Sequence, residues 1–296
     1  AVQFRGGYHD YAIVKGGLRV FPRLVAAEHR QASTRAQLSS GVPALDALLG
    51  GGIEEGTSTL LVGATGTGKS TIAAQFAWAA ARRGQRSALF LFDESPQTLL
   101  TRCREVNIEL APLIESGMVA VTQVDPTELT PGEFTHAIRA EVDEGAKIVV
   151  IDSLNGYLNA MPEERFLTAQ LHELLTYLGH KGVVTFLIVA QHGLFGSMQS
   201  PIDTTYLADT VVLFRYFESQ GAVRQAISVV KKRSGKHERT IRELRLESGG
   251  ISDMADKAGP KPISCARDLG PSVAHLVDRY REIECPQLRR NVDRYI

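Results

Sequence analysis

Short apolar runs alternate with amphipathic segments between about residue 57 and residue 191. The apolar runs are rich in Val, Ile and Leu without polar alternation, which indicates strands that are buried on both faces. The segments between them carry apolar residues at helical spacing. This alternation predicts a mostly parallel sheet flanked by helices. The predicted strands span 58–62, 87–92, 118–124, 147–152 and 183–191, and the predicted helices span 70–83, 95–106, 130–146 and 163–180.

The pattern changes after residue 206, where the helical spacing stops. Three runs with strand character follow at 210–217, 224–233 and 238–247. We expect them to be antiparallel strands that extend the central sheet. The sequence thus predicts an α/β fold with a mostly parallel central sheet, flanking helices and C-terminal antiparallel strands.

A glycine-rich turn, VGATGTGKST at 62–71, joins the first predicted strand to the first predicted helix. It completes the pattern G-x-x-x-x-G-K-[ST], whose backbone N–H groups and helix N-terminus bind phosphate. Lys69 is expected to reach the β- and γ-phosphates, and Ser70 is expected to bind magnesium. The predicted nucleotide-binding residues are Gly63, Ala64, Thr65, Gly66, Thr67, Gly68, Lys69, Ser70 and Thr71.

Three acidic residues lie at the ends of predicted strands. Asp152 ends the strand 147–152 and is predicted to hold magnesium opposite Ser70. Asp93 and Glu94 follow the strand 87–92, where a carboxylate can orient water or accept a proton from an attacking hydroxyl. Either acid can be this base, because neighbours along a strand face opposite ways. A solvated acidic turn or a helix cap is the structural alternative.

Two further polar features each allow a functional and a structural interpretation. Gln191 ends the strand 183–191 and fits a sensor of the γ-phosphate as well as it fits an ordinary polar strand end. Lys231, Lys232 and Arg233 form a basic turn, and such turns are usually solvated surface. In a ring-forming ATPase, the same position can present Lys and Arg to the nucleotide of a neighbouring subunit.

The start of the chain is similar to its last predicted strands. Chance similarity between two basic hairpins is one explanation. The other is that residues 1–21 are the last hairpin of an upstream copy of the same domain. The matching residues are Arg5 with Arg233, Gly7 with Gly235, His9 with His237, Asp10 with Glu238, Ile13 with Ile241 and, after a gap, Gly16–Gly17 with Gly249–Gly250.

We divide the chain into three parts. Residues 1–30 form the terminal hairpin of an upstream repeat plus a linker, residues 31–251 form the nucleotide-binding domain, and residues 252–296 form a linker and a helical tail. Gly and two Pro interrupt 256–264, and 271–284 carries apolar residues on one helical face. The tail either docks a partner or packs on the domain, and the sequence favours neither.

The composition restricts the function further. Lys plus Arg and Asp plus Glu number 33 each, and this zero net charge argues against a dedicated nucleic-acid binder. The cysteines, Cys103, Cys265 and Cys285, lack metal-ligand spacing and indicate reduced thiols. The first ten residues do not resemble a signal peptide, and the longest apolar run, 183–190, is too short to cross a bilayer. We therefore expect a cytoplasmic protein without a membrane partner.

Five motifs, in order along the chain, resemble the KaiC family, the RecA-like ATPases of the bacterial circadian clock and their non-clock relatives. The resemblance covers roughly residues 39–251 and the hairpin at the start. It is carried by SSGVPALDALLGGGIEEGTSTLLVGATGTGKST (39–71), LFLFDESPQTLL (89–100), IVVIDSL (148–154), DTTYLADTVVLFRYFE (203–218) and VVKKRSGKHERTIREL (229–244).

The resemblance implies a RecA-like P-loop NTPase that binds and hydrolyses Mg-ATP at the subunit interfaces of a homo-hexameric ring. Lys231 and Arg233 would then reach the nucleotide of the neighbouring subunit, and His237 would join them. Family members usually carry two such domains in tandem, which explains the similarity between the two ends. In the family one of the paired acids is the general base. The pair here is Asp93–Glu94, with Asp where the clock proteins carry Glu.

The second domain of the clock proteins also phosphorylates itself on adjacent Ser and Thr, just before the strand that DTVVL (209–213) matches. In this register the hydroxyls fall on Thr205 and Tyr206, with Thr204 one residue earlier. We therefore predict autophosphorylation mainly at Thr205, because a phenol is a poor substitute for threonine. The corresponding function is a switch controlled by nucleotide or phosphorylation, with a regulatory protein partner.

Two other functions share this nucleotide site. A RecA- or RadA-like DNA-dependent ATPase would place basic loops after Asp152 and Gln191. The segment 153–166 is net acidic and 192–206 contains no Lys or Arg, so DNA binding is not expected. The non-enzymatic alternative is a scaffold that binds ATP tightly and hydrolyses it slowly. Asp93 and Glu94 argue against an inactive site but not against a slow one.

Overall fold

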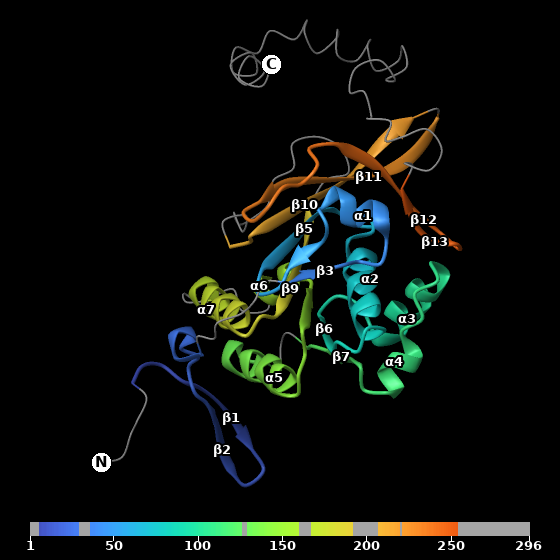
Figure 1. The fold of residues 1–296 in the computed structure, drawn as a ribbon. Coiled ribbons are helices and arrows are strands. Elements are labelled where there is room, and N and C mark those ends of the chain that lie inside the picture. The colour runs from blue at the N-terminus through green and yellow to red at the C-terminus, as the bar shows by residue number, and fades with distance from the viewer. Residues whose placement is uncertain are drawn as a thin grey trace, which may run out of the picture.

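The computed structural model describes residues 6–29, 36–125, 129–159, 167–191, 207–219 and 221–253. Most of them belong to one nine-stranded sheet with helices on both faces (Figure 1). The strands lie in the order β13-β12-β11-β10-β5-β9-β8-β6-β7, so the predicted α/β class is confirmed. They are β5 (Ser58–Ala64), β6 (Ser87–Leu91), β7 (Val119–Gln123), β8 (Ile148–Asp152), β9 (Val184–Gln191), β10 (Thr210–Ser219), β11 (Ala222–Lys232), β12 (Ile241–Glu247) and β13 (Gly250–Asp253).

The direction of β10 differs from the prediction. β10 pairs in parallel with β5, with Phe214 opposite Gly63, although all three C-terminal runs are predicted to be antiparallel. Parallel strands need a connection that carries the chain from the carboxyl end of one strand back to the amino end of the next, and a strand's own sequence does not show such a return. The prediction holds for β11 and β12, which pair antiparallel and extend the sheet. β13 was not predicted, and it pairs antiparallel with β12 at the edge.

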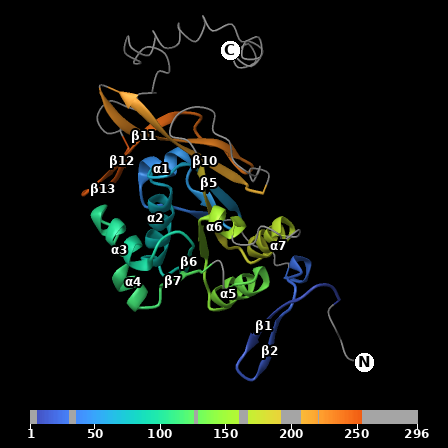
Figure 2. The same ribbon diagram turned by 180° about the vertical axis from the view of Figure 1, so that it is seen from behind.

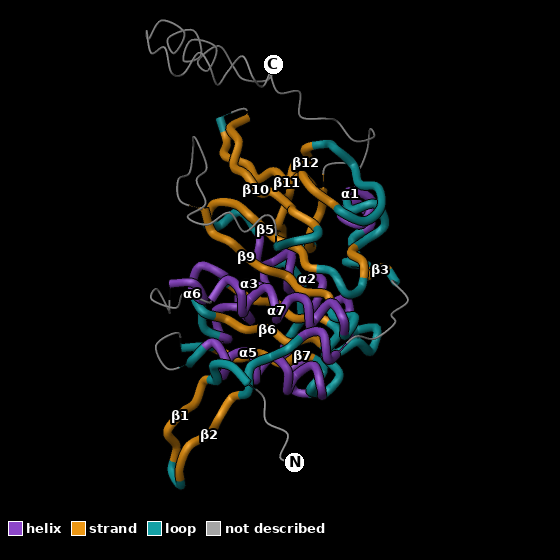
Figure 3. The backbone as a smooth tube through the Cα atoms, turned by 90° about the vertical axis from the view of Figure 1, so that its left-hand side faces the viewer, coloured by secondary structure: helices purple, strands orange, loops and turns teal. Residues whose placement is uncertain are grey.

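The helices form two groups, one on each face of the sheet (Figures 1 and 2). Alternate residues of β5 show why both faces are apolar, since Leu61 packs with α2 and Leu60 packs with α5 to α7. Figure 3 shows the second group from its own side, with α5, α6 and α7 toward the viewer. The first group is α1 (Pro43–Leu48), α2 (Lys69–Ala81), α3 (Pro96–Glu105) and α4 (Ala111–Glu115), and the second is α5 (Pro131–Asp143), α6 (Leu154–Asn159) and α7 (Leu167–His180).

Local capping fixes where two predicted helices begin. The Ser95 hydroxyl accepts a hydrogen bond from the Thr98 N–H at the start of α3, and the Thr130 hydroxyl accepts one from the Glu133 N–H at the start of α5. Helices α1, α4 and α6 are not predicted, because five or six residues are too few to establish a helical period. No helix in the described ranges is long and apolar enough to cross a membrane.

The N-terminal hairpin lies outside the main sheet (Figure 1). It consists of β1 (Asp10–Val14) and β2 (Gly17–Phe21), followed by the short 3-10 helix η1 (Ala26–His29); a second small sheet pairs β3 (Gln37–Leu38) with β4 (Ile53–Glu54). The Asp10 carboxylate accepts a 2.6 Å hydrogen bond from the Gly132 N–H at the start of α5. The hairpin is therefore attached to the domain at its base.

The far part of this hairpin exposes an apolar face. Tyr11 lies opposite Val20, and Ile13 lies opposite Leu18, and all four side chains are exposed. The hairpin β12–β13 closes in the same way, since Val14 pairs with Gly17 and Glu247 pairs with Gly250 across equally short turns. In β12–β13, however, the apolar residues Leu244, Leu246 and Ile251 pack on the core beside α1 and α2.

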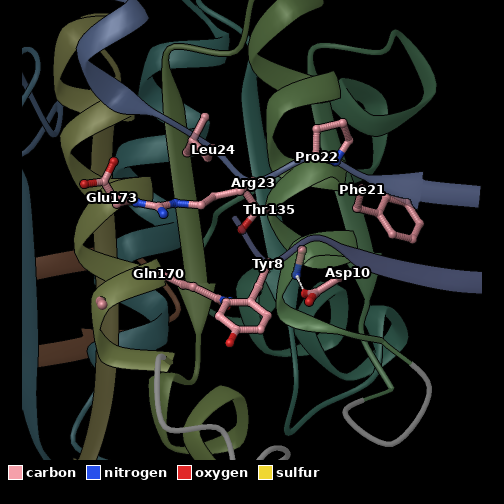
Figure 4. A pocket seen from close by; sticks show the side chains of 11 residues that line it. Tyr8, Asp10, Phe21, Pro22, Arg23, Leu24, Thr135, Gln170 and Glu173 are labelled. Carbon is pink, nitrogen blue, oxygen red and sulfur yellow. Dashed lines mark hydrogen bonds between the residues drawn. The ribbon is translucent and has the colours of Figure 1, made fainter. Parts of the chain in front are cut away.

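A cavity of about 390 Å³ lies between the base of the hairpin and helices α5 and α7 (Figure 4). Phe21, Pro22 and Leu24 form its apolar wall, and Gln170 and Glu173 of α7 approach from the other side. The Glu173 carboxylate accepts a hydrogen bond from the Ala26 N–H at 3.1 Å. The residues that line this cavity include none of the glycine-rich turn, so the cavity is separate from the predicted nucleotide site.

Candidate nucleotide site

The glycine-rich turn lies between β5 and α2, at the carboxyl end of the central strand. Gly68 has a φ of +96° and Gly66 a φ of +81°, which L side chains rarely adopt. A Cβ on Gly66 would also lie 2.6 Å from the Tyr216 hydroxyl, and one on Gly68 would lie 2.8 Å from Leu246. The glycines therefore allow β10 and β12 to pack directly against the loop.

Lys69 lies inside this loop and is only 6% exposed. Its ammonium donates to the carbonyl oxygens of Gly63 at 2.8 Å and Ala64 at 2.7 Å. Burial lowers the pKa of Lys69 to about 8, and the nearby Asp152 carboxylate opposes this shift. The loop thus presents a buried cation at the N-terminus of α2, where an anionic ligand gains from the helix dipole as well.

Three hydrogen bonds hold the loop in shape. The Thr67 hydroxyl donates to the Ala64 carbonyl at 2.7 Å, the Tyr216 hydroxyl donates to the Thr65 carbonyl at 3.1 Å, and the Gln225 amide donates to the Gly66 carbonyl at 3.2 Å. Tyr216 and Gln225 are cross-strand neighbours on β10 and β11. Neither residue was predicted to contact the loop, because nothing in their local pattern points to a segment more than a hundred residues away.

Asp152 and Ser70 meet beside Lys69. Asp152 is the last residue of β8 and is 8% exposed. Burial raises the pKa of Asp152 to about 6, and the nearby Ser70 hydroxyl counteracts part of that rise. A carboxylate and a hydroxyl are hard oxygen ligands of the kind that Mg²⁺ prefers, so the pair fits a magnesium ion shared with phosphate oxygens.

The described residues contain no cluster of three His, Cys, Asp or Glu side chains that could hold a metal on its own. A magnesium ion at this place would therefore depend on ligands from the nucleotide and water. This is the usual arrangement where one or two protein groups share the ion with substrate phosphates.

Asp93 and Glu94 turn away from each other. They follow β6, which lies beside β8 with Leu91 opposite Asp152. The Ser153 hydroxyl donates to the Asp93 carboxylate, and Arg102 forms an ion pair with Glu94 at 2.5 Å. The structure thus brings both acids to the carboxyl end of the sheet near Asp152, with Asp93 exposed and Glu94 half-buried. Ser153 and Arg102 were not predicted.

Gln191 ends β9 opposite Ala64 of β5, so it lies beside the glycine-rich turn. Its buried side-chain oxygen has no hydrogen-bond partner among the described residues. The neighbouring Ala190 is held by Asn155 of α6, whose amide donates to the Ala190 carbonyl at 3.1 Å and accepts from its N–H at 2.8 Å. Asn155 was not predicted, and it fixes the strand end that carries Gln191.

The basic turn lies at the opposite end of the sheet from the glycine-rich turn. Lys231 pairs with Val211, which in turn pairs with Leu60 near the start of β5. The Lys231 ammonium donates to the Ala208 carbonyl at 2.8 Å, and Arg233 pairs with Asp209 at 3.4 Å. His237, which follows, lines a shallow cavity on the β10–β11–β12 surface. The chain's own phosphate loop is thus out of reach of these side chains.

The basic turn rests on the turn 49–52, which follows α1. The Lys232 ammonium donates to the carbonyls of Leu49 at 2.5 Å and Gly52 at 3.1 Å, and burial lowers the pKa of Lys232. The Glu238 N–H donates to the Leu48 carbonyl at 3.1 Å. Lys232 therefore anchors the turn, while its two neighbours, Lys231 and Arg233, remain on the other side of the strand.

We expect Gly50→Ala to destabilise the protein by about 3 kcal/mol, because a Cβ there would lie 1.7 Å from the Lys236 carbonyl oxygen. Gly182→Ala is the matched control, since both glycines have a φ of +71° and a Cβ on Gly182 meets nothing within 4 Å. The control should lose only roughly 1 kcal/mol from backbone strain. Urea unfolding of both variants measures the difference, and equal losses would contradict the close contact.

The predicted phosphorylation residues Thr204, Thr205 and Tyr206 lie outside the described residues, as do Cys265, Cys285 and all but the first two residues of the predicted tail 252–296. The third cysteine, Cys103, is buried in α3, and burial raises the pKa of its thiol to about 11.

Comparison with known proteins agrees with this geometry. The family model described as ATPase: KaiC matches residues 38–258. Circadian clock oscillator proteins KaiC from Picosynechococcus sp. and Rippkaea orientalis are 28% and 27% identical over 250 and 248 residues, or 83% and 82% of this chain. The match covers 48% and 47% of those proteins, so the chain spans about half the length of the relatives it matches. The chain belongs to the KaiC ATPase family, and its fold is the RecA-like P-loop fold.

Proposed function

We propose that this chain is an ATP-binding and ATP-hydrolysing domain of a KaiC-like ring protein. One observation carries the proposal: the buried Lys69, the Ser70–Asp152 pair and the acids Asp93 and Glu94 meet at the carboxyl ends of β5, β6 and β8. Ligands of open α/β sheets bind at this edge. Residues 63–71 would bind the phosphates, and Asp93 or Glu94 would orient the attacking water.

Magnesium is part of this proposal. Ser70 and Asp152 would hold the ion, and the influence of the Ser70 hydroxyl on the Asp152 carboxylate supports a shared ligand position. When bound, Mg²⁺ neutralises charge on the β- and γ-phosphates. Gln191 would sense the γ-phosphate, in keeping with its buried oxygen beside the loop.

We further propose that Lys231, Arg233 and His237 act on the nucleotide of a neighbouring subunit in a homo-hexamer. The place of the basic turn at the opposite end of the sheet supports this role, because Lys231 and Arg233 cannot reach the phosphate loop of their own subunit from there. Cations supplied in trans stabilise the charge that develops during phosphoryl transfer.

Residues 1–30 fit the end of an upstream copy of the domain. The closing pairs of β1–β2 and β12–β13 correspond, and the exposed face of Tyr11, Ile13, Leu18 and Val20 would pack on that copy as Leu244 and Ile251 pack here. The curated relatives are about twice as long as their match to this chain, which leaves room for a second domain. Residues 252–296 remain proposed as a linker and helical tail that docks a partner or packs on the ring.

The finer proposal is a switch that phosphorylates itself and whose phosphorylated state a regulatory partner protein binds. Thr205 is the main proposed site, and Thr204 and Tyr206 are neighbouring candidates. The relatives are circadian clock oscillator proteins, and this function of theirs suggests such a switch for the chain. A DNA-dependent ATPase and a slowly hydrolysing scaffold remain the alternatives. No observation in the described residues favours either.

Incubation with Mg-ATP, followed by measurement of free phosphate and intact mass, tests these proposals together. We expect free phosphate to accumulate, which establishes the ATPase. A gain of whole phosphate groups in the protein would establish the autokinase, and phosphopeptides outside 203–206 would refute the assignment to Thr205. Unchanged mass with accumulating phosphate would leave an ATPase without autokinase activity. Nucleotide binding without phosphate release would favour the scaffold.

A further inference from the structure

Arg102 of α3 bridges two parts of the candidate site. One guanidinium nitrogen contacts the Glu94 carboxylate at 2.5 Å, and another donates to the Thr71 hydroxyl at 2.8 Å. Thr71 is 3% exposed and belongs to the first turn of α2, directly after Ser70. The planar fork of Arg can make both contacts at once, whereas Lys has a single nitrogen.

We propose that Arg102 is a positioning residue for the proposed ATPase, which fixes Glu94 against the phosphate-loop helix and offsets the negative charge that surrounds the phosphate site. The inference rests on the proposed function and adds a residue to it. Thr71 and Glu94 belong to the predicted motifs, whereas Arg102 does not. Because Arg102 lies on α3 and contacts both residues, the distance between Glu94 and the phosphate loop depends on how α3 packs.

The charges near the site explain why a second cation matters there. Asp93, Glu94 and Asp152 place three carboxylates at the edge where a triphosphate would bind, and Lys69 lies among them. Without Arg102, the same acids would repel the phosphates more strongly, and Glu94 would lose the group that fixes its orientation.

A purely structural ion pair between α3 and the chain after β6 is the competing explanation. The Arg102 and Glu94 side chains are 29% and 19% exposed, and half-buried pairs of this kind also hold helices in place. Such a pair would change the melting temperature of a variant. A purely structural pair gives no reason for KM and kcat to respond differently to a substitution. It also predicts the same affinity for ATP in Arg102→Lys and Arg102→Gln.

The experiment compares Arg102→Gln, Arg102→Lys and Arg104→Gln with the unmodified protein. Arg104 lies exposed on the same helix two residues away and serves as the matched control. We expect Arg102→Gln to lower kcat about tenfold and to raise KM for ATP about tenfold. Arg102→Lys should recover most of the KM because it restores the charge, but not the kcat, because the single nitrogen of Lys does not reproduce the planar fork with which two Arg102 nitrogens reach Glu94 and Thr71.

A second measurement separates failure of this inference from failure of the proposed function. If the unmodified protein releases no phosphate, the ATPase proposal fails, and the binding of a fluorescent ATP analogue then judges Arg102. Weaker binding by Arg102→Gln than by Arg104→Gln and Arg102→Lys would support the charge role. Equal binding by all three variants, or kcat and KM within twofold of the unmodified protein in Arg102→Gln, would overturn the inference. A lower melting temperature alone would assign Arg102 to structure.

Discussion

Replacing Lys69 with alanine should lower ATP turnover by about 10²–10³-fold. The buried ammonium is held within 2.8 Å of two loop carbonyls, at the place where a bound phosphate would take over its contacts. Without it, no cation inside the loop offsets the charge of the γ-phosphate. Phosphate release at saturating Mg-ATP measures the loss. Lys147→Ala, an exposed lysine just before β8, is the matched control and should retain full turnover.

The same variant should remain folded. Because burial lowers the pKa of Lys69 in the folded chain below its value in the unfolded chain, the charged side chain costs stability at neutral pH. This cost is complete below about pH 8 and disappears as the pH rises toward the unfolded value. Alanine removes the cost, so a lost activity with an unchanged or higher melting temperature is expected. Turnover within tenfold of the unmodified protein would contradict the assignment of Lys69.

Replacing Arg233 with alanine should lower the turnover of the assembled protein by about 10³-fold, which is the usual effect of an arginine supplied in trans. Arg233 is 55% exposed and its ion pair with Asp209 is long, so leaving that pair for a neighbour's phosphate would cost little. Arg104→Ala, exposed and distant from the basic turn, is the control. Light scattering must show that the variant assembles as the unmodified protein does.

A mixture of Lys69→Ala and Arg233→Ala subunits distinguishes action in trans from action within one subunit. In a mixed ring, an interface is intact where an Arg233→Ala subunit provides the phosphate loop and a Lys69→Ala subunit provides Arg233. An equal mixture should therefore recover about a quarter of the interfaces, and roughly that share of the turnover. If Arg233 acts within its own subunit, no subunit in the mixture is complete and the turnover stays at the level of the variants alone.

The sequence by itself determined most of the strands and longer helices along the chain and the chemistry of the phosphate loop. Runs of Val, Ile and Leu predict β5, β6, β8 and β9, because strands buried on both faces can contain no polar alternation. Ser95 and Thr130 mark helix starts, since their hydroxyls satisfy local N–H groups. The residues 63–70 identify the phosphate loop in the same way, because the motif is a pattern of neighbouring residues.

Only the tertiary structure decided how distant residues meet. Local sequence does not show that β10 runs parallel to β5, since strand direction depends on where the connection returns. It also does not show that Tyr216 and Gln225 support the loop, that Arg102 bridges Glu94 and Thr71, or that the basic turn lies at the far end of the sheet. These relations come from the packing of segments far apart in the chain, which no residue pattern within one segment records.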